Sequence, residues 1–432
     1  MPFPRYLNSF NIYIIILIIS LGNAIEAIIP FSLLNNIFYL FVHFLLIYLG
    51  IYYQRFLLTL IFFITGIILD LSLLAANFGP HIFTFMILIF LAGSFVISLL
   101  LTGYLRQYAL SKQLMDVPNH RSSHKTPTPR GGGLSFVLCF LMLIPILYAS
   151  RLIPQTLALA LIVCGGAIAL LGFLDDKYQI SAKKRLLGHI SISALALYFS
   201  GGVPTLNIFS LELSSGLFLS IVAIFYLVWL LNLYNFMDGI DGIAGLEAIS
   251  VCIGAVVIYC FDGYYNSIFL PLALVFPVVG FLFWNLPSAK IFMGDVGSSF
   301  LGFVLGVMSI HAASLDNRLF WGWIILLAVF IVDATVTLLY RAVTRQPLMQ
   351  AHCNHAYQYA SRKFKSHALV SCSVLMINIF WLLPWAVLIT TGKVNTGGGL
   401  LIAYIPLIIL ALKFHAGKAE IFFPTQSGID QS

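Results

Sequence analysis

Long apolar segments, separated by short polar loops, run along almost the whole chain. Segments such as FLSIVAIFYLVWLL (218–231) and LFWGWIILLAVFIV (319–332) contain no charged residue. With their flanks, most approach the ~20 residues that a helix needs to cross the ~30 Å hydrocarbon layer of a membrane. Because backbone groups in lipid must be satisfied within the segment, and because the runs are continuous rather than alternating, we expect spanning helices and not a transmembrane β-barrel.

This pattern predicts an all-α, polytopic membrane protein with about fourteen transmembrane helices. Residues 1–80 would form an N-terminal membrane region of three helices, residues 82–415 would contain eleven more, and residues 416–432 are expected to be a flexible polar tail. The expected spans are residues 11–29, 33–50, 56–77, 82–105, 132–150, 155–174, 187–201, 216–231, 243–260, 267–284, 298–313, 319–340, 367–391 and 398–413.

The composition excludes a soluble protein, because 61% of the 432 residues are hydrophobic and only 9% are charged. The mean hydropathy is +1.01. A cleaved signal peptide is not expected, because the first apolar run lacks a strongly basic flank and a small-residue cleavage site. The six cysteines form no CxxC pair and lie mostly in apolar runs, which favours a packing role for them.

The basic residues define the expected topology. When the loops are assigned alternately to the two sides, nineteen of the 22 Lys and Arg residues fall on one side. Positive residues remain on the cytoplasmic side of a membrane, so this side, which also holds both termini, is predicted to be cytoplasmic. The net charge of +7 is explained by this topology.

Six aspartates fall on the same predicted side, at helix ends or in short loops. Carboxylates at the edge of a membrane span are costly, which makes them candidates for a functional role. They are Asp116, Asp175, Asp176, Asp238, Asp241 and Asp295.

Three acidic motifs together predict a phosphoryl-transfer site. They are GFLDDKYQISAKKRL with Asp175 and Asp176, NLYNFMDGIDG with Asn232, Asn235, Asp238 and Asp241, and AKIFMGDVGSSF with Asp295. Carboxylate and amide oxygens without cysteine suit a hard cation, Mg²⁺ or alternatively Mn²⁺, and nearby basic residues suit phosphate. Positioning and charge neutralisation carry catalysis at such sites. The sequence has neither GxxxxGK[ST] nor GxGxxG, which argues against a nucleotide-driven pump.

Two basic loops add candidates for anion binding. The loop MDVPNHRSSHKTPTPRGGG contains Lys125 and Arg130, and the loop RQPLMQAHCNHAYQ contains His352 and His355. Topology alone also explains basic cytoplasmic loops, and a zinc site at these histidines is disfavoured because matching ligands are lacking elsewhere. Asp333, inside a predicted span, is equally consistent with lining a cavity and with helix packing.

Six motifs, taken in their order along the chain, resemble those of the polyprenyl-phosphate N-acetylhexosamine-1-phosphate transferases. They are HRSSHKTPTPRGGG, GFLDDKYQISAKKRL, NLYNFMDGIDGIAGLE, FMGDVGSSFLGF, DATVTLLYR and HCNHAYQ. The resemblance covers residues 82–415, eleven of the expected spans. Within the family, the chain looks most like the bacterial enzymes that start the synthesis of O-antigen or related surface polysaccharides.

The resemblance implies a reaction at the cytoplasmic face of the bacterial inner membrane. A UDP-N-acetylhexosamine such as UDP-GlcNAc would transfer its sugar-1-phosphate to undecaprenyl phosphate, and UMP would leave. The implied partners are these two substrates and membrane lipids, without nucleic acid, and the oligomeric state is left open.

The resemblance also implies residue roles. Asp295 and Asn235 would bind Mg²⁺, and Asp175 and Asp176 would approach the lipid phosphate, one of them removing its proton. The remaining candidates would bind substrate: Asp238 and Asp241, with Asn232 in the same motif, would hold nucleotide and metal, and phosphates or sugar would be contacted by Lys125, Arg130, Arg185, His352 and His355.

Two departures bear on the substrate. Gln179 stands where pentapeptide transferases of the family commonly have lysine, and AHCNHAYQ replaces their run of histidines. Both argue against a peptidoglycan precursor. The competing class is a membrane transporter or channel with a cytoplasmic-side ion or anion site, although such proteins commonly place ionisable groups near the bilayer midplane. A non-catalytic scaffold would need no aspartate cluster.

Overall fold

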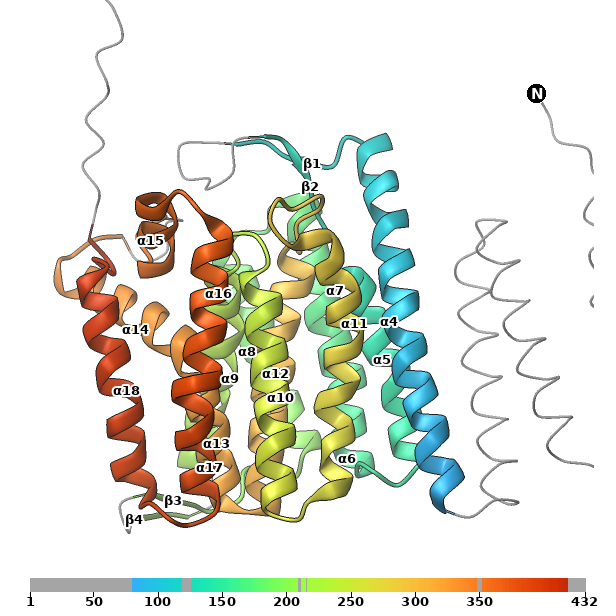
Figure 1. Ribbon diagram of the computed structural model, residues 1–432, viewed down its shortest axis with the longest axis vertical. Helices are drawn as coiled ribbons and strands as arrows, with labels where there is room; N and C mark the ends of the chain where they lie inside the picture. The colour runs from blue at the N-terminus through green and yellow to red at the C-terminus, as the bar shows by residue number, and fades with distance from the viewer. Residues whose placement is uncertain (1–79, 119–125, 209–210, 215, 348–351, 419–432) are drawn as a thin grey trace, which may run out of the picture. The chain divides into compact units, whose positions relative to one another are not determined.

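The computed structural model describes residues 80–118, 126–208, 211–214, 216–347 and 352–418. The chain divides into two compact units, Met1–Ile89 and Phe90–Ser432. The second unit is a bundle of helices (Figure 1). The three spans predicted before residue 80 and the tail after residue 418 lie outside the described residues.

The described chain is almost entirely helical. Its helical elements are α4 (Pro80–Ser111), α5 (Leu134–Ala149), α6 (Gln155–Leu159), the π-helical turn η1 (Ala160–Cys164), α7 (Gly165–Tyr178), α8 (Ala182–Phe199), α9 (Leu217–Met237), α10 (Ile243–Phe261), the 3-10 turn η2 (Tyr265–Ile268), α11 (Phe269–Asn285), α12 (Asp295–Leu315), α13 (Asn317–Leu326), α14 (Ala328–Val343), α15 (Ala356–Phe364), α16 (His367–Ile377), the π-helical turn η3 (Asn378–Leu382), α17 (Leu383–Thr390) and α18 (Thr396–Lys413).

Two short antiparallel hairpins complete the described part. Strand β1 (Met115–Asp116) pairs with β2 (Thr128–Pro129), with Met115 opposite Pro129. Strand β3 (Leu206–Ile208) pairs with β4 (Leu211–Leu213), with Leu206 opposite Leu213. The two hairpins lie at opposite ends of the bundle, and α15 lies at the end that holds β1 and β2 (Figure 1).

Each of the eleven segments expected within residues 82–415 contains a helix, which confirms the all-α membrane fold. In the described part of the chain, eight helices are long and apolar enough to cross a membrane, or nine if α13 and α14, which meet at a bend of 67°, form one span. Helix α5 is shorter, with 16 residues. The expected total of fourteen spans is therefore not confirmed.

Helix boundaries differ from the expected ones where polar residues continue a helix. Helix α8 begins at Ala182, so Lys183, Lys184 and Arg185 occupy its first turn instead of a loop. Helix α9 continues through Asn232 and Asn235 to Met237. Apolar runs report the part of a helix that lies in lipid and miss the turns that project beyond it.

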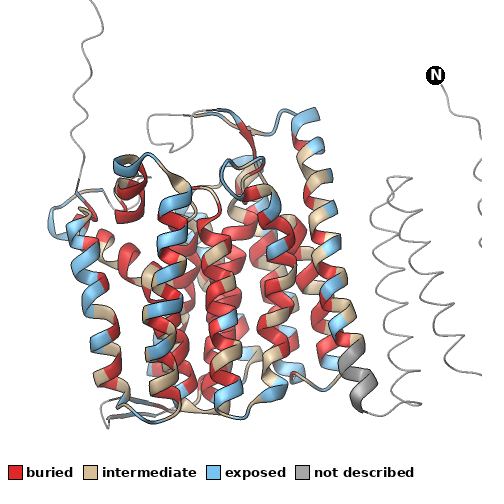
Figure 2. Cartoon of the chain, viewed as in Figure 1, coloured by how far each residue is buried: buried red, intermediate tan, exposed pale blue. Residues whose placement is uncertain are grey.

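Helix α12 forms the centre of the second unit. Seventeen of its 21 residues are buried, and Figure 2 shows buried residues concentrated in the middle of the bundle. It packs against α9 and α7, and at its far end against α13. The position of α12 therefore determines where its first residue, Asp295, lies relative to the ends of the surrounding helices.

Glycines allow this central packing to be close. A Cβ atom at Gly302 would lie 2.4 Å from the backbone oxygen of Leu230 in α9, and one at Gly172 of α7 would lie 2.5 Å from the backbone oxygen of Asp295. Small residues let helix backbones approach in membranes, where van der Waals packing is a main source of association.

We expect Gly302→Ala to destabilise the protein, because α9 and α12 must separate to accept the methyl group. The loss should be about 1–3 kcal/mol, as for other overpacked cores, and thermal unfolding in detergent would measure it. Gly398→Ala in α18 is the matched control, since no described atom lies within 4 Å of a Cβ there. Equal melting temperatures for the two variants would contradict the proposed packing constraint.

Candidate active site

The three acidic motifs converge at one end of the bundle. A cavity of about 220 Å³ opens there, and its wall is predominantly polar. The motif residues that line it are Asp176, Asn235, Asp238, Asp241 and Asp295, joined by Arg130. Segments more than a hundred residues apart in the sequence thus contribute to one site.

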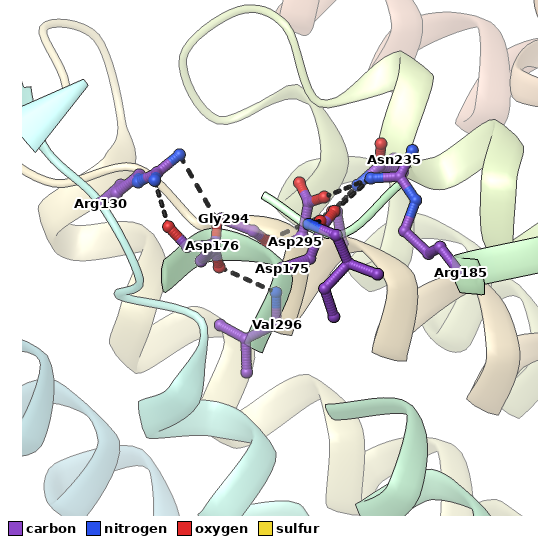
Figure 3. Close-up of polar contacts among 10 residues, drawn as sticks. Arg130, Asp175, Asp176, Arg185, Asn235, Gly294, Asp295 and Val296 are labelled. Carbon is purple, nitrogen blue, oxygen red and sulfur yellow. Dashed lines mark hydrogen bonds and ion pairs between the residues drawn. The ribbon is translucent and has the colours of Figure 1, made fainter. Parts of the chain in front are cut away.

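The end of α7 presents Asp175 within a fixed turn. The helix terminates at Gln179, whose φ of 52° is left-handed, and the amide N–H of Ile180 then donates to Asp175 Oδ1 at 2.7 Å. Arg185, from the first turn of α8, pairs with the other oxygen of Asp175 and also with Asp295 Oδ2 at 3.2 Å (Figure 3). One guanidinium thus joins the end of α7 to the beginning of α12.

The neighbouring Asp176 caps α12. Its Oδ2 accepts the N–H of Val296 at 3.2 Å, so its charge meets the positive end of the helix (Figure 3). Glycine is required at position 294, because φ is +75° and a Cβ would lie 2.7 Å from Asp176 Oδ2. Arg130 adds an ion pair to Asp176 Oδ1 at 3.9 Å and donates to its backbone carbonyl.

The Pro-Arg-Gly-Gly-Gly segment is fixed to the segment before α12. The N–H of Phe292 donates to the carbonyl of Pro129 at 2.8 Å, and Gly132 N–H donates back to Phe292 at 2.9 Å. At Gly133 a Cβ would meet the α-carbon of Gly297 at 2.6 Å. This close approach explains the glycines and places Arg130 at the edge of the cavity.

The opposite wall comes from the end of α9. The side-chain amide of Asn235 donates to Ser298 Oγ at 3.3 Å in the first turn of α12, the helix that Asp295 begins. Asp238 follows directly after the helix. Burial raises the pKa of Asp238 well above the ordinary value, and neighbouring negative charges raise it further. Those charges belong to Asp295, Asp176 and Asp241.

A second cavity, of about 250 Å³, adjoins the first. It shares Arg130, Asp176 and Asp295 with the first cavity and adds Asp175 and Arg185. The carboxylates of Asp176 and Asp295 therefore lie where the two polar cavities meet, and Arg130 lines both cavities. This arrangement can hold two anionic groups against a cation without placing either in the lipid layer.

The donor set fits a hard divalent cation that retains water. Within the described residues, no group of three His, Cys, Asp or Glu side chains is placed to hold a metal by itself. Mg²⁺ is usually bound by one or two carboxylates, with water and substrate oxygens completing the octahedron. Asp295 and Asn235, which line the same cavity, could supply two such oxygen ligands.

The two predicted histidines lie outside these cavities. His355 is 2% exposed, and its Nδ1 lies 3.3 Å from Asp333 Oδ1. His352 stacks on it with a ring separation of 5.0 Å. Burial lowers the pKa of His352 to about 3, with His355 and Arg341 contributing, so its ring is neutral. Their predicted contact with phosphate or sugar stays a prediction.

Asp333 fixes the short helix α15. Its oxygens accept the N–H groups of Ala356 at 3.0 Å and Tyr357 at 2.9 Å. Tyr357 Oη in turn donates to the carbonyl of Phe236 at 2.9 Å, beside the acidic cavity. Two roles were considered for Asp333, lining a cavity and helix packing. The hydrogen bonds to α15 correspond to helix packing, and Asp333 also lines a separate apolar cavity.

Of two other candidates, one lies away from the cavities and one is not among the described residues. The side chain of Asn232 donates to Val228 within α9 at 2.7 Å, and Asn232 does not line either acidic cavity. Lys125 lies outside the described residues. Their assignment to substrate binding stays a prediction.

Several residues of the acidic cavity were not predicted as site residues from the sequence, among them Asn285, Gln358 and His367. Asn285 accepts the N–H of Gly242 at 3.1 Å and donates to Ile291, so it links two loops. Gln358 of α15 and His367 of α16 also line the acidic cavity. In the sequence, these residues are marked only by being polar and lying at the end of an apolar run. Many helix ends that have no functional role share this feature.

Known proteins resemble this chain over much of its length. Residues 158–313 match the family described as Glycosyl transferase family 4. The chain is 30% identical over 295 residues to the probable undecaprenyl-phosphate N-acetylglucosaminyl 1-phosphate transferase of Bacillus subtilis, an alignment covering 66% of this chain and 80% of that protein. It is 29% identical over 278 residues to the decaprenyl-phosphate N-acetylglucosaminephosphotransferase of Mycolicibacterium smegmatis, covering 56% and 67%.

A third relative carries a different sugar in its name. The chain is 31% identical over 244 residues to the phospho-N-acetylmuramoyl-pentapeptide-transferase of Lactococcus lactis, covering 52% of this chain and 70% of that protein. Together with the helical bundle and its acidic site, these similarities define a multi-pass membrane transferase of sugar phosphates. The chain belongs to the polyprenyl-phosphate N-acetylhexosamine-1-phosphate transferase family.

We expect Asp333→Ala to release α15, because two backbone N–H groups would lose their acceptor. The destabilisation should be about 1–3 kcal/mol, the cost of buried donors without partners. Limited trypsin digestion should then cleave faster at Arg362 and Lys363, which end α15, while cleavage at Lys413 of α18 serves as the internal reference. An unchanged digestion pattern would contradict the capping role.

Asp238→Asn should stabilise the protein increasingly as pH rises. When the pKa of a carboxyl is higher in the folded than in the unfolded protein, the free energy of unfolding falls as pH rises above the unfolded value of about 3.9. The reason is that the unfolded chain releases this proton at a lower pH than the folded chain does. The neutral amide avoids this loss. We therefore expect the melting temperature of the variant to exceed that of the wild type at pH 8 by more than at pH 4.5. A difference independent of pH would contradict the assignment.

Proposed function

We propose that this protein transfers N-acetylhexosamine-1-phosphate from a UDP-sugar to undecaprenyl phosphate and releases UMP. An oxygen of the lipid phosphate would attack the phosphorus that carries the sugar, and the bond from that phosphorus to UMP would break. The observation that carries the proposal is the pair of polar cavities that meet at Asp176 and Asp295. One cavity would receive the pyrophosphate of the donor and the other the acceptor phosphate.

An apolar cavity beside the site supports a lipid acceptor. It measures about 400 Å³ and is lined by α14, α15, α16 and α18. Met237 and Tyr357, which line it, are chain neighbours of Asp238 and Gln358 in the acidic cavity. A polyprenyl chain lying there would stay in apolar surroundings while its phosphate approached the carboxylates.

The contacts of the paired aspartates favour Asp176 as the base. Both oxygens of Asp175 are engaged, one by the amide of Ile180 and the other by Arg185. Asp176 lines both polar cavities, and the contact between its Oδ1 and Arg130 is long, at 3.9 Å. Asp176 would therefore accept the proton of the lipid phosphate, while Asp175 would orient Arg185.

Mg²⁺ is the proposed cofactor, with Mn²⁺ as the alternative. When bound, the ion would neutralise the charge of the donor pyrophosphate. Asp295 and Asn235 would hold it, and Asp238 and Asp241 would help to hold metal and nucleotide. Arg130 and Arg185 would contact the phosphates in the two cavities, where each already faces a carboxylate.

The proposed location is the bacterial inner membrane with the site facing the cytoplasm. The distribution of Lys and Arg supports this orientation, because the loops of the site end contain most of them. UDP-sugars are cytoplasmic, so donor and site would lie on the same side. The proposed product would start an O-antigen-like surface polysaccharide, since Gln179 and the AHCNHAYQ loop argue against a peptidoglycan precursor.

Product formation tests the proposal directly. The purified protein, in lipid nanodiscs with undecaprenyl phosphate and Mg²⁺, should convert UDP-GlcNAc or a related UDP-N-acetylhexosamine to a lipid-linked pyrophosphoryl sugar and UMP. Asp295→Ala should lower turnover at least tenfold, the usual effect of disturbing a metal site. Asp316→Ala is the matched control, because this aspartate also lies at a helix N-terminus, but at the opposite end of α12.

A donor panel and a flux measurement separate the alternatives. The mass of the lipid product from a mixture of UDP-sugars would identify the sugar. If the protein instead moved an ion or anion across vesicle membranes without forming product, the transporter or channel hypothesis would replace the transferase. Normal turnover by Asp295→Ala would overturn the metal assignment but leave the reaction intact.

A further inference from the structure

His367, the first residue of α16, contacts the acidic site from a helix more than a hundred residues away in the sequence. Its Nδ1 lies 3.3 Å from Asp241 Oδ1, with the two side chains 20% and 11% exposed. The same Nδ1 accepts the backbone N–H of Asp241 at 3.5 Å. This hydrogen bond requires the tautomer whose ring proton is on Nε2.

Asp241 is held from the other side as well. Its Oδ2 accepts the N–H of Ala289 at 3.1 Å, from the loop that precedes α12. Its backbone carbonyl accepts Ser371 Oγ at 3.0 Å. His367 and Ser371 are four residues apart, so they lie on the same face of α16. Helix α16 therefore holds this residue by both its side chain and its backbone.

The pair stands between two cavities. Asp241 and His367 line the acidic cavity, and both also line an adjoining cavity of about 570 Å³ that contains Lys365. Asp241 lies in a short loop that also contains Gly239 and Gly242. Glycine gives such a loop much conformational freedom, so the direction of the carboxylate must be fixed by contacts from outside the loop.

We propose that His367 is a positioning residue that holds the carboxylate of Asp241 in the orientation that binds the donor. The hydrogen bond from the Asp241 N–H to Nδ1 fixes the backbone of this residue, the amide of Ala289 fixes one carboxylate oxygen, and the carboxylate then faces both cavities. The identity of the donor as a UDP-sugar rests on the proposed function, whereas the pairing of the two side chains does not.

The position of the accepting nitrogen of His367 allows a sharp test. The amide oxygen of asparagine can occupy the position of Nδ1, whereas that of glutamine lies nearer the position of Nε2. We therefore expect His367→Asn to keep the KM for the UDP-sugar within about threefold of the wild type. His367→Ala and His367→Gln should raise it about tenfold or more, with kcat and the KM for undecaprenyl phosphate nearly unchanged, because a contact present in both ground and transition states is lost.

Ser366→Ala is the matched structural control. Ser366 caps α16 by accepting the N–H of Leu369 at 3.1 Å, so its loss weakens the same helical turn but leaves His367 in the chain. It should lower the melting temperature without changing the donor KM. If it raised the donor KM as much as His367→Ala does, or if asparagine rescued no better than glutamine, the positioning role would be overturned.

A double-mutant cycle measured by thermal unfolding tests the pairing of Asp241 with His367 without requiring transferase activity. Asp241→Ala, His367→Ala and the double variant should shift the melting temperature non-additively, because each single change already removes the 3.3 Å contact between the imidazole and the carboxylate. Additive shifts would overturn the proposal even in an active enzyme. Absence of transfer by the wild type would instead refute the proposed function, and the cycle would still give its own answer for the pair.

Discussion

The structure depends on the compensation of several carboxylates that lie close together at one end of a membrane bundle. Their mutual repulsion is offset locally: Asp176 is placed on the N-terminus of α12, and Arg185 bridges Asp175 and Asp295. Such compensation is needed because charges near a low-dielectric layer are weakly screened. The same bonds that make the carboxylates tolerable also connect α7, α8 and α12, so stability and the geometry of the site have one origin.

The charge network does not by itself fix the positions of the helix ends and loops of the site, which also depend on packing and hydrogen bonds from the surrounding helices. Close packing at glycines brings α7 and α9 against the central α12, which sets the height of Asp295 in the bundle. The loop between α9 and α10 is then held from outside by Asn285 of α11 and by Ser371 of α16. The site is therefore made of helix ends whose unsatisfied backbone groups are bonded by side chains from other helices, which is a general requirement at helix termini.

The helical fold and the gathering of the acidic motifs at one end of the bundle could be predicted from the sequence for a physical reason. The contacts that support these motifs could not, for a different reason. Continuous apolar runs identify lipid-spanning helices, and carboxylates are too costly at a membrane edge to lie there by chance. Neither signal reports bends or distant partners. The bend between α13 and α14 follows no proline, and His367 begins an ordinary apolar segment. The pairing of His355 with Asp333 needed the path of α15, which the spacing of residues does not contain.

The cap on α15 has a consequence for exchanging parts between relatives. Because the carboxylate that fixes this helix belongs to α14, the polar segment between α14 and α16 is not a self-contained module. A chimera that transplants residues 344–366 alone would separate the inserted helix from the acceptor of its first amides unless the recipient supplies an equivalent aspartate. Grafts of this segment therefore call for a boundary within the preceding membrane helix, before Asp333.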